Sequence, residues 1–293
     1  MEPQIDWLKT LVRCKNRIKE QVRPLIETQS PPQKGLGIGA GGDPIEQVDL
    51  VAEDAILETL KELGTSFTLI SEESGAKEYG STPKEVFVVA DPIDGSTNLI
   101  RGIPFYATSI AVSSGPLINT VHTALVADLA HDITYTARRR KGAHRNGKKI
   151  SPSEKESLED AVIGIDLNTY RVEDIAPRLT KLIGRTKHIR HLGANALELC
   201  YVADGTTDAF VDIRGKLRTT DIAAGWLIAG EAGAEITALT GEQLYSKLGP
   251  TERTAFIASG NRKIHTKILH LLNQNRRHDA NTVTAPSGRH DKS

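Results

Sequence analysis

The segment at residues 91–97, with the sequence Asp-Pro-Ile-Asp-Gly-Ser-Thr, holds the side chains best suited to chemistry. The apolar run at 86–90 predicts a buried strand that delivers Asp91 at its end. Pro92 is expected to stop the strand there, since proline has no N–H group for the ladder. Asp94 follows three residues after Asp91, so both carboxylates can turn toward one point.

Backbone N–H groups follow these carboxylates at Gly95 and Ser96, where a short helix can begin. The start of a helix suits an anion, because its first N–H groups have no acceptor within the helix. Carboxylates beside such a site predict hard cations held between the carboxylates and a phosphate.

Two further acidic segments repeat this design, and Asp49 lies on the polar side of a predicted helix. A strand predicted at 68–70 leads into Glu72 and Glu73, and Asp221 opens an apolar helix that it can also cap. Taken alone, each acid has an ordinary role as a turn former, a solvated strand end or a cap. Together they imply bound metal, because clustered carboxylates without a counter-ion repel one another.

The elements that must position these acids fall into two halves. Apolar spacing and turn signals in the first half predict helices at 5–26 and about 44–63, and strands at 68–70, 86–90, 105–112, 120–127 and 133–137. Strand and helix alternate in the second half, with strands at 161–166, 186–191, 208–213 and 254–258, and helices at 172–184, 194–203, 221–232 and 261–273.

This order predicts an α/β or α+β protein built in layers. Residues 1–157 form an expected N-terminal α+β lobe that carries the main acidic motifs. Residues 158–273 form an expected α/β lobe that completes the site. Residues 274–293 have little apolar content and are expected to be a disordered tail.

Composition excludes several classes of protein. The 37 Lys and Arg residues balance the 37 Asp and Glu residues, which argues against a general nucleic-acid binder. No run of 18 uncharged apolar residues occurs, so no membrane span is expected. Residues 1–9 carry acids and no apolar core, so a signal peptide is not expected either. Cys14 and Cys200 are too few for a disulfide framework or a structural zinc site, and they fit a reducing cytoplasm.

Three linked motifs resemble those of the inositol monophosphatase superfamily of magnesium-dependent, lithium-sensitive phosphatases. They are the segment 91–97, the upstream acidic segment 70–74 and the downstream segment 220–225. The stretches 201–205 and 208–218 look most like the archaeal-type branch, whose members often hydrolyse both inositol monophosphate and fructose 1,6-bisphosphate. The resemblance implies an α-β-α-β-α sandwich with metals between two lobes.

The resemblance also implies a set of metal ligands. Glu72, Asp91 and the carbonyl of Ile93 would bind the first ion, and Asp91, Asp94 and Asp221 the second. The implied ions are two or three Mg²⁺, with Mn²⁺ as a possible substitute and Li⁺ as the inhibitor.

A third, weaker ion is the least defined part of this expectation. Glu72 would contribute to it, and Asp49 would act through waters near it. The glycine-rich stretch 35–42 is expected to be a loop over the metals that could bring Lys34 or Asp43 toward that ion. The stretch satisfies G-x-G-x-x-G, but no strand precedes it, so a dinucleotide site is not expected.

Catalytic and substrate roles follow from the same resemblance. Ser96, with Glu72, would position and deprotonate the attacking water, and the amides of Gly95 and Ser96 would hold phosphate oxygens. Serine replaces the threonine common in the family and keeps the hydroxyl group. Asp212 would contact a sugar hydroxyl, and Asn195 lies where the substrate ring would pack.

A second phosphate, as in fructose 1,6-bisphosphate, would need cations from the chain. The sequence offers four candidates near the predicted site, which are Arg190, Arg214, Lys216 and Arg218.

The leading hypothesis is a cytoplasmic, Mg²⁺-dependent phosphomonoesterase acting on inositol monophosphate, fructose 1,6-bisphosphate or both. It would use in-line attack by a metal-activated water and no phosphoenzyme. One alternative removes phosphate from 3′-phosphoadenosine 5′-phosphate or NADP. Another is a catalytically silent binding or regulatory protein of the same fold. A homodimer is implied by the resemblance alone, and no nucleic-acid or membrane partner is expected.

Overall fold

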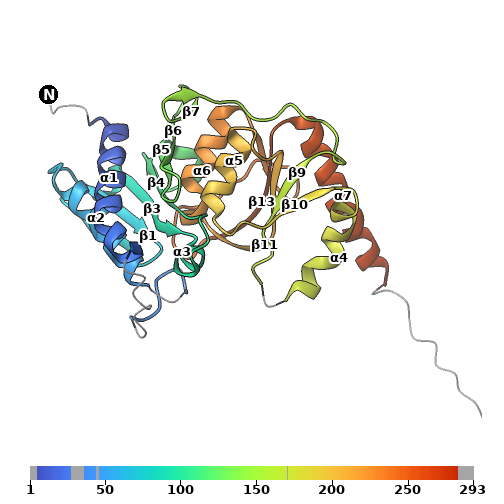
Figure 1. Cartoon of the computed structure of the whole chain (residues 1–293), viewed down its shortest axis with the longest axis horizontal. Coiled ribbons are helices and arrows are strands. Elements are labelled where there is room, and N and C mark those ends of the chain that lie inside the picture. Colours follow the sequence, from blue (N-terminus) through green and yellow to red (C-terminus); the bar gives the residue numbers. More distant parts are fainter. Residues whose placement is uncertain (1–4, 28–35, 44–45, 170, 283–293) are drawn as a thin grey trace, which may run out of the picture.

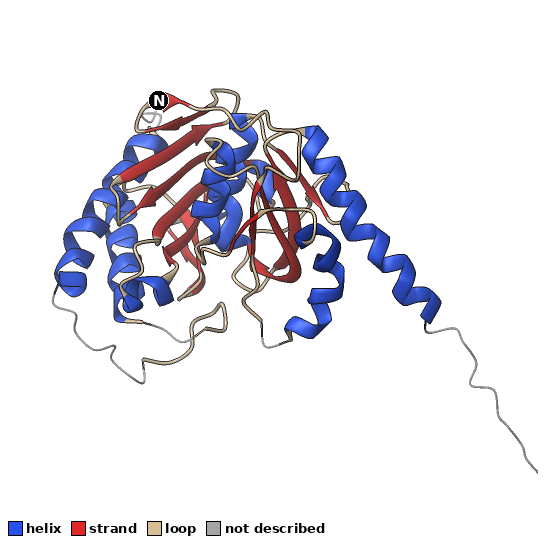
Figure 2. Ribbon diagram, turned by 45° about the vertical axis from the view of Figure 1, so that its right-hand side comes forward, coloured by secondary structure: helices blue, strands red, loops and turns tan. Residues whose placement is uncertain are grey.

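Helices and sheets alternate in five layers in this computed structural model, which describes residues 5–27, 36–43, 46–169 and 171–282 (Figures 1 and 2). The three helical layers are formed by α1 (Trp7–Glu27) with α2 (Gln47–Lys61), α5 (Asn195–Ala203) with α6 (Thr219–Ala232), and α4 (Val172–Ile183) with α7 (Arg262–Thr282). The layered α-β-α-β-α sandwich is therefore confirmed.

Two sheets lie between these helical layers. The first has eight strands in the order β2-β1-β3-β4-β5-β6-β7-β8, which are β1 (Phe67–Ser71), β2 (Gly75–Tyr79), β3 (Phe87–Asp94), β4 (Ala107–Ser113), β5 (Val121–Asp128), β6 (Ile133–Arg138), β7 (Ala143–Arg145) and β8 (Lys148–Lys149). The second has five strands in the order β10-β9-β11-β13-β12, which are β9 (Val162–Ile165), β10 (His188–Arg190), β11 (Ala209–Arg218), β12 (Glu235–Ala238) and β13 (Arg253–Ser259). The short α3 (Ser96–Arg101) follows β3, and two 3₁₀ turns cover Pro83–Glu85 and Ile118–Thr120.

Successive strand residues pack into different layers, because side chains alternate between the faces of a sheet. In β3, Val88 packs toward α1 and α2, while Val89 packs toward α5 and α6. In β11, Phe210 joins the central cluster around α5 and α6, while Val211 joins the cluster under α4 and α7. The central helical layer therefore shares an apolar core with both sheets. The chain passes from the first sheet to the second between residues 149 and 162, and the division at residue 157 stays a prediction.

The end of β3 differs from the expectation that Pro92 stops the strand. Pairing with β4 breaks after Asp91 and resumes at Asp94, which lies opposite Ala107. Pro92 falls within this irregular stretch, where the ladder is interrupted and the missing N–H group is tolerated.

Other expectations about single elements were also wrong. Helix α7 continues to Thr282, into the predicted tail, because neither glycine nor proline occurs in it. The remaining tail residues, 283–293, lie outside the described part of the chain. Strand β11 extends past residue 213 to Arg218 through a register shift. Strand β2 was missed because its central residues are exposed and show no apolar alternation.

Two glycines in α6 provide a matched test of the packing between α5 and α6. A Cβ atom added at Gly225 would lie 2.9 Å from Leu199 Cβ and 3.0 Å from the Ala196 carbonyl oxygen, both on α5. A Cβ atom at Gly230 meets no described atom of a neighbouring element within 4 Å. We expect Gly225→Ala to lower the free energy of unfolding by about 1–3 kcal/mol through overpacking. Gly230→Ala should raise it by up to about 1 kcal/mol through helix propensity.

Chemical denaturation of both variants measures these changes. A Gly225→Ala protein as stable as Gly230→Ala would contradict the close approach of the two helices.

Candidate metal and active site

Three carboxylates from separate elements converge at one edge of the first sheet. Oxygen atoms of Glu72, Asp91 and Asp221 all lie within 4.8 Å of one another. β1 and β3 run parallel, with Ser71 opposite Ala90. The next residues along the chain, Glu72 and Asp91, therefore lie beside each other. Asp221 comes from the first turn of α6. These acids were predicted from the sequence, and the fold brings them together.

Asp94 is held next to this group by the start of α5. Its two carboxylate oxygens accept the backbone N–H groups of Asn195, at 2.9 Å, and Ala196, at 2.7 Å. The positive end of a helix dipole favours a carboxylate at this position. Burial, with a further contribution from Asp221, nevertheless raises the pKa of Asp94 to about 7.

Burial and mutual repulsion act on the other acids of the site in the same direction. Burial and the charge of Asp221 raise the pKa of Glu72 to about 9, and burial and Glu72 raise that of Asp91 well above its usual range. Asp49, on α2, has a pKa raised to about 8 by burial and by Glu73. An oxygen-only donor set with this much unbalanced charge suits a hard divalent cation. The residues present therefore fit the metal that the motifs imply.

One of the four candidate phosphate ligands, Arg218, lies among these acids. Its Nη2 lies 2.7 Å from Glu72 Oε1, its Nε 2.9 Å from Asp221 Oδ1, and its Nη1 2.7 Å from Asp43 Oδ2. The guanidinium is thus engaged with carboxylates on every nitrogen. Lys34, the other residue expected near a third ion, lies outside the described residues.

The turn between β3 and α3 requires glycine. Gly95 has a φ of 89°, and a Cβ atom there would lie 3.1 Å from the Phe105 carbonyl oxygen and 3.1 Å from Ala194 Cβ. Asn98 fastens the same turn to the second half of the chain, because its Nδ2 donates to the carbonyl oxygens of Phe105, at 2.8 Å, and Leu192, at 2.7 Å. The first residues of α3 therefore have a fixed position beside the carboxylates.

A pocket of about 1020 Å³ joins these parts. It is lined by the acids, by Ile93 and by Gly95 and Ser96 at the start of α3. Its opposite wall comes from the second sheet and the adjoining loops, and its polar side chains include Asp166, Asn168, Thr169, His191, Arg214 and Lys216.

The predicted substrate residues have different positions. Asn195 and Lys216 line the pocket, and Lys216 Nζ donates to Thr169 Oγ1 at 3.1 Å. Arg214 also lines it, but its guanidinium is paired with Asp166 and Asp212. Asp212 is fully buried by this pairing and, among the described residues, is not part of the lining.

The exposed Arg190, on β10, is likewise absent from the described lining. Sequence reasoning missed Asp166 and His191, which follow the parallel strands β9 and β10. The ends of parallel strands share one edge of a sheet, so the rule that selected Glu72 and Asp91 could have found them.

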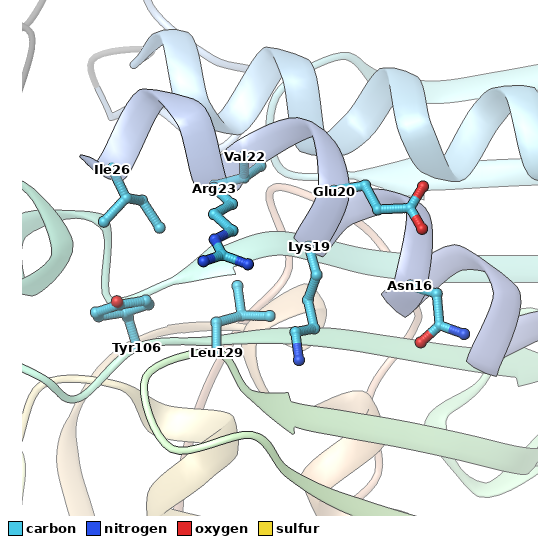
Figure 3. A pocket seen from close by; sticks show the side chains of 8 residues that line it. All are labelled: Asn16, Lys19, Glu20, Val22, Arg23, Ile26, Tyr106 and Leu129. Atoms are coloured by element: carbon cyan, nitrogen blue, oxygen red, sulfur yellow. The ribbon is translucent and has the colours of Figure 1, made fainter. Parts of the chain in front are cut away.

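A second pocket, of about 540 Å³, lies along α1. Lys19 and Arg23 face Tyr106 and Leu129 across it, as Figure 3 shows. Glu20 is the one acid among its described lining residues. It therefore lacks the clustered carboxylates that mark the larger pocket.

Comparison with known proteins assigns the family. A sequence model of the inositol monophosphatase family matches residues 7–277. The chain belongs to the inositol monophosphatase family. It is a phosphatase of a metal-dependent family, and its buried acidic cluster can bind metal.

Individual relatives support this assignment. The chain is 37% identical over 275 residues to a fructose-1,6-bisphosphatase/inositol-1-monophosphatase of Methanothermobacter thermautotrophicus, covering 91% of this chain and 96% of the relative. It is 33% identical over 288 residues to a bifunctional NADP phosphatase/NAD kinase of Methanococcus maripaludis, covering 92% of this chain and 49% of the relative. A crystal structure of an inositol monophosphatase-fructose 1,6-bisphosphatase aligns with a TM-score of 0.81 at 33% identity, covering 91% of this chain and 100% of that one.

In the described part of this family member, no helix has the length and apolar character needed to cross a membrane.

Mg²⁺ is expected to stabilise the wild-type protein, and Asp91→Asn should remove that effect. A ligand at about 100 times its Kd adds about 2.7 kcal/mol to the free energy of unfolding, which is several degrees in Tm. In EDTA the variant should melt no lower than wild type, because an amide cannot take on the charge whose burial and repulsion raise the pKa of Asp91. Thermal melts with EDTA and with Mg²⁺ measure both effects.

Glu85→Gln, at an exposed acid of a 3₁₀ turn outside the pocket, is the control and should keep the wild-type shift. An equal Mg²⁺ shift in Asp91→Asn would contradict the expectation that Asp91 is a metal ligand.

Proposed function

We propose that this chain is a Mg²⁺-dependent phosphomonoesterase that hydrolyses inositol monophosphate, fructose 1,6-bisphosphate or both. The observation that carries the proposal is the convergence of Glu72, Asp91 and Asp221 beside the start of α3 in one large pocket. The name of the Methanothermobacter relative supports both substrates.

The proposed metal ligands are those that the motifs imply. Glu72, Asp91 and the Ile93 carbonyl hold one ion, and Asp91, Asp94 and Asp221 hold the other. All five residues line the same pocket, which supports this set of ligands. When bound, such ions neutralise the phosphate, lower the pKa of water and stabilise the leaving oxygen. Mn²⁺ as a substitute, Li⁺ as an inhibitor and a third ion near Glu72 and Asp49 belong to the same proposal.

The reaction transfers a phosphoryl group to water. A water oxygen forms a new bond to phosphorus, the ester P–O bond breaks, and the leaving alkoxide takes a proton. The Ser96 hydroxyl and the Glu72 carboxylate position the water and accept its proton. The backbone N–H groups of Gly95 and Ser96 bind phosphate oxygens, which the rigid turn at Gly95 supports.

Lys216 is the cation proposed to meet a second phosphate. Arg214 and Arg218 are already paired with carboxylates, and Arg190 lies outside the described lining. Lys216 lines the pocket, and its Nζ donates there to the neutral hydroxyl of Thr169. Asn195 is proposed to contact the sugar ring. The role of Asp212 is then indirect, since it holds Arg214 in the pocket wall.

A nucleotide substrate is the second candidate, because the Methanococcus relative is named as an NADP phosphatase. No Phe, Tyr or Trp side chain lines the pocket in the described part of the chain, and the His191 imidazole is the one ring there, so stacking of an adenine ring has little support. This favours a sugar phosphate. The buried free thiols of Cys14 and Cys200 support a reducing, cytoplasmic location. A homodimer rests on the family resemblance.

Phosphate release from D-myo-inositol 1-phosphate and from fructose 1,6-bisphosphate, measured with Mg²⁺, tests the proposal. Asp94→Asn should lower kcat about 10²-fold or more, because several kcal/mol of charge stabilisation depends on the metal that Asp94 helps to hold. Asp128→Asn is the matched control. Asp128 is also buried and accepts two backbone N–H groups, from Ala130 and His131, but lies outside the pocket lining among the described residues.

Activity on neither compound would contradict the proposal. NADP and 3′-phosphoadenosine 5′-phosphate are then the next substrates, and inactivity on all four indicates a silent binding protein.

Lys216→Ala should raise KM for fructose 1,6-bisphosphate about tenfold, because the loss of one charge-assisted hydrogen bond weakens binding by about that factor. KM for inositol 1-phosphate should stay the same, because that substrate has no second phosphate. Lys216→Arg should restore most of the affinity. Equal changes for both substrates would contradict this role.

A further inference from the structure

The side chain of Arg218 lies among the clustered carboxylates of the candidate metal site. Its side chain is 13% exposed, and it engages both oxygens of Asp221, one through Nε and the other through its own backbone N–H. Its Nη2 pairs with Glu72, whose side chain is equally buried. Two of the three acids that form the candidate metal group therefore already have a cationic partner.

The backbone opposite Arg218 is shaped to receive it. A Cβ atom at Gly41 would lie 2.5 Å from Arg218 Nη1 and 3.1 Å from its Cδ, so a side chain at that position would displace the guanidinium. Gly41 is fixed in turn by its N–H bond to the Glu72 carbonyl oxygen, at 2.7 Å, and by Arg253 Nη2, which donates to the Gly41 carbonyl oxygen at 2.6 Å. Asp43, two residues on, supplies the third ion pair.

A guanidinium and a divalent cation compete for the same carboxylate oxygens and require different geometries of them. Arginine binds carboxylates through fixed N–H directions, whereas Mg²⁺ and Mn²⁺ need those oxygens as close ligands. Any cation bound by Glu72 and Asp221 must also share the site with a permanent positive charge, because arginine does not lose its proton.

From these contacts we infer that Arg218 is an internal competitor of the divalent cation at Glu72 and Asp221. It stabilises the buried acids and, by the same contacts, lowers the affinity of the site for metal. The inference rests on the metal site proposed above and is independent of the substrate.

The first test is the affinity for Mn²⁺, measured by electron paramagnetic resonance of the free ion. Arg218→Gln should bind Mn²⁺ at least tenfold more tightly than wild type. Arg253→Gln is the matched control, since Arg253 lines the same pocket and its guanidinium donates to the backbone oxygens of Gly41 and Pro250. This variant loses the same charge, but the bonds it removes go to backbone carbonyl oxygens, so it should change the affinity less than threefold. Circular dichroism checks that each variant is folded.

The second test uses the wild-type protein and covers the case in which Arg218→Gln does not fold. The Nε–H signal of Arg218 in a ¹⁵N–¹H spectrum, assigned by its loss in Arg218→Lys, should be protected from exchange by Asp221. Saturating Mg²⁺ should shift this signal and remove the protection.

The outcomes separate the two proposals. If wild type binds no Mn²⁺, the metal site itself is wrong, and the competition inference falls with it. If wild type binds Mn²⁺ but Arg218→Gln binds it equally or more weakly, the competition inference alone is overturned. An Nε–H signal unchanged by saturating Mg²⁺ would overturn it as well.

Discussion

The repulsion among buried acids is the constraint on which the rest of the structure depends. Glu72, Asp91, Asp94 and Asp221 come together where little water can screen them, and burial raises the pKa of the first three. The surrounding elements offset this negative charge in several ways. Helix α5 directs two N–H groups at Asp94, the backbone before α6 donates to Asp221, and Arg218 adds a full positive charge.

The central helical layer makes this arrangement possible. Helices α5 and α6 pack between the two sheets, and both begin at the pocket, so their N-termini meet the acids delivered by β1 and β3. Gly225 lets the helices approach closely, and Asn98 fastens α3 to the loop before α5. The parts of the site therefore depend on one another through ordinary packing and hydrogen bonds.

The acids of the site could be predicted from the sequence because their positions follow from local rules. A strand that ends in acids, such as the one before Asp91, places them at a sheet edge in almost any layered fold. The cations could not be predicted in the same way. Arg214 and Arg218 have the charge that a phosphate needs, but their partners are acids distant in sequence or across a turn, and only the tertiary structure reveals them. The helical extension of α7 and strand β2 were missed because neither has a strong apolar pattern.

The order in which the layers occur along the chain has a consequence for synthesis on the ribosome. The first sheet is complete by Lys149, whereas the helices that cover its inner face begin at Asn195 and Thr219. A nascent chain that ends between these points exposes an apolar face that includes Val89 and Val126, with the acids still hydrated at its edge. The charges are then desolvated only when α5 and α6 emerge, bringing the N–H groups and the arginine that offset their repulsion. Co-translational folding would thus postpone the least favourable step until its compensating groups are available.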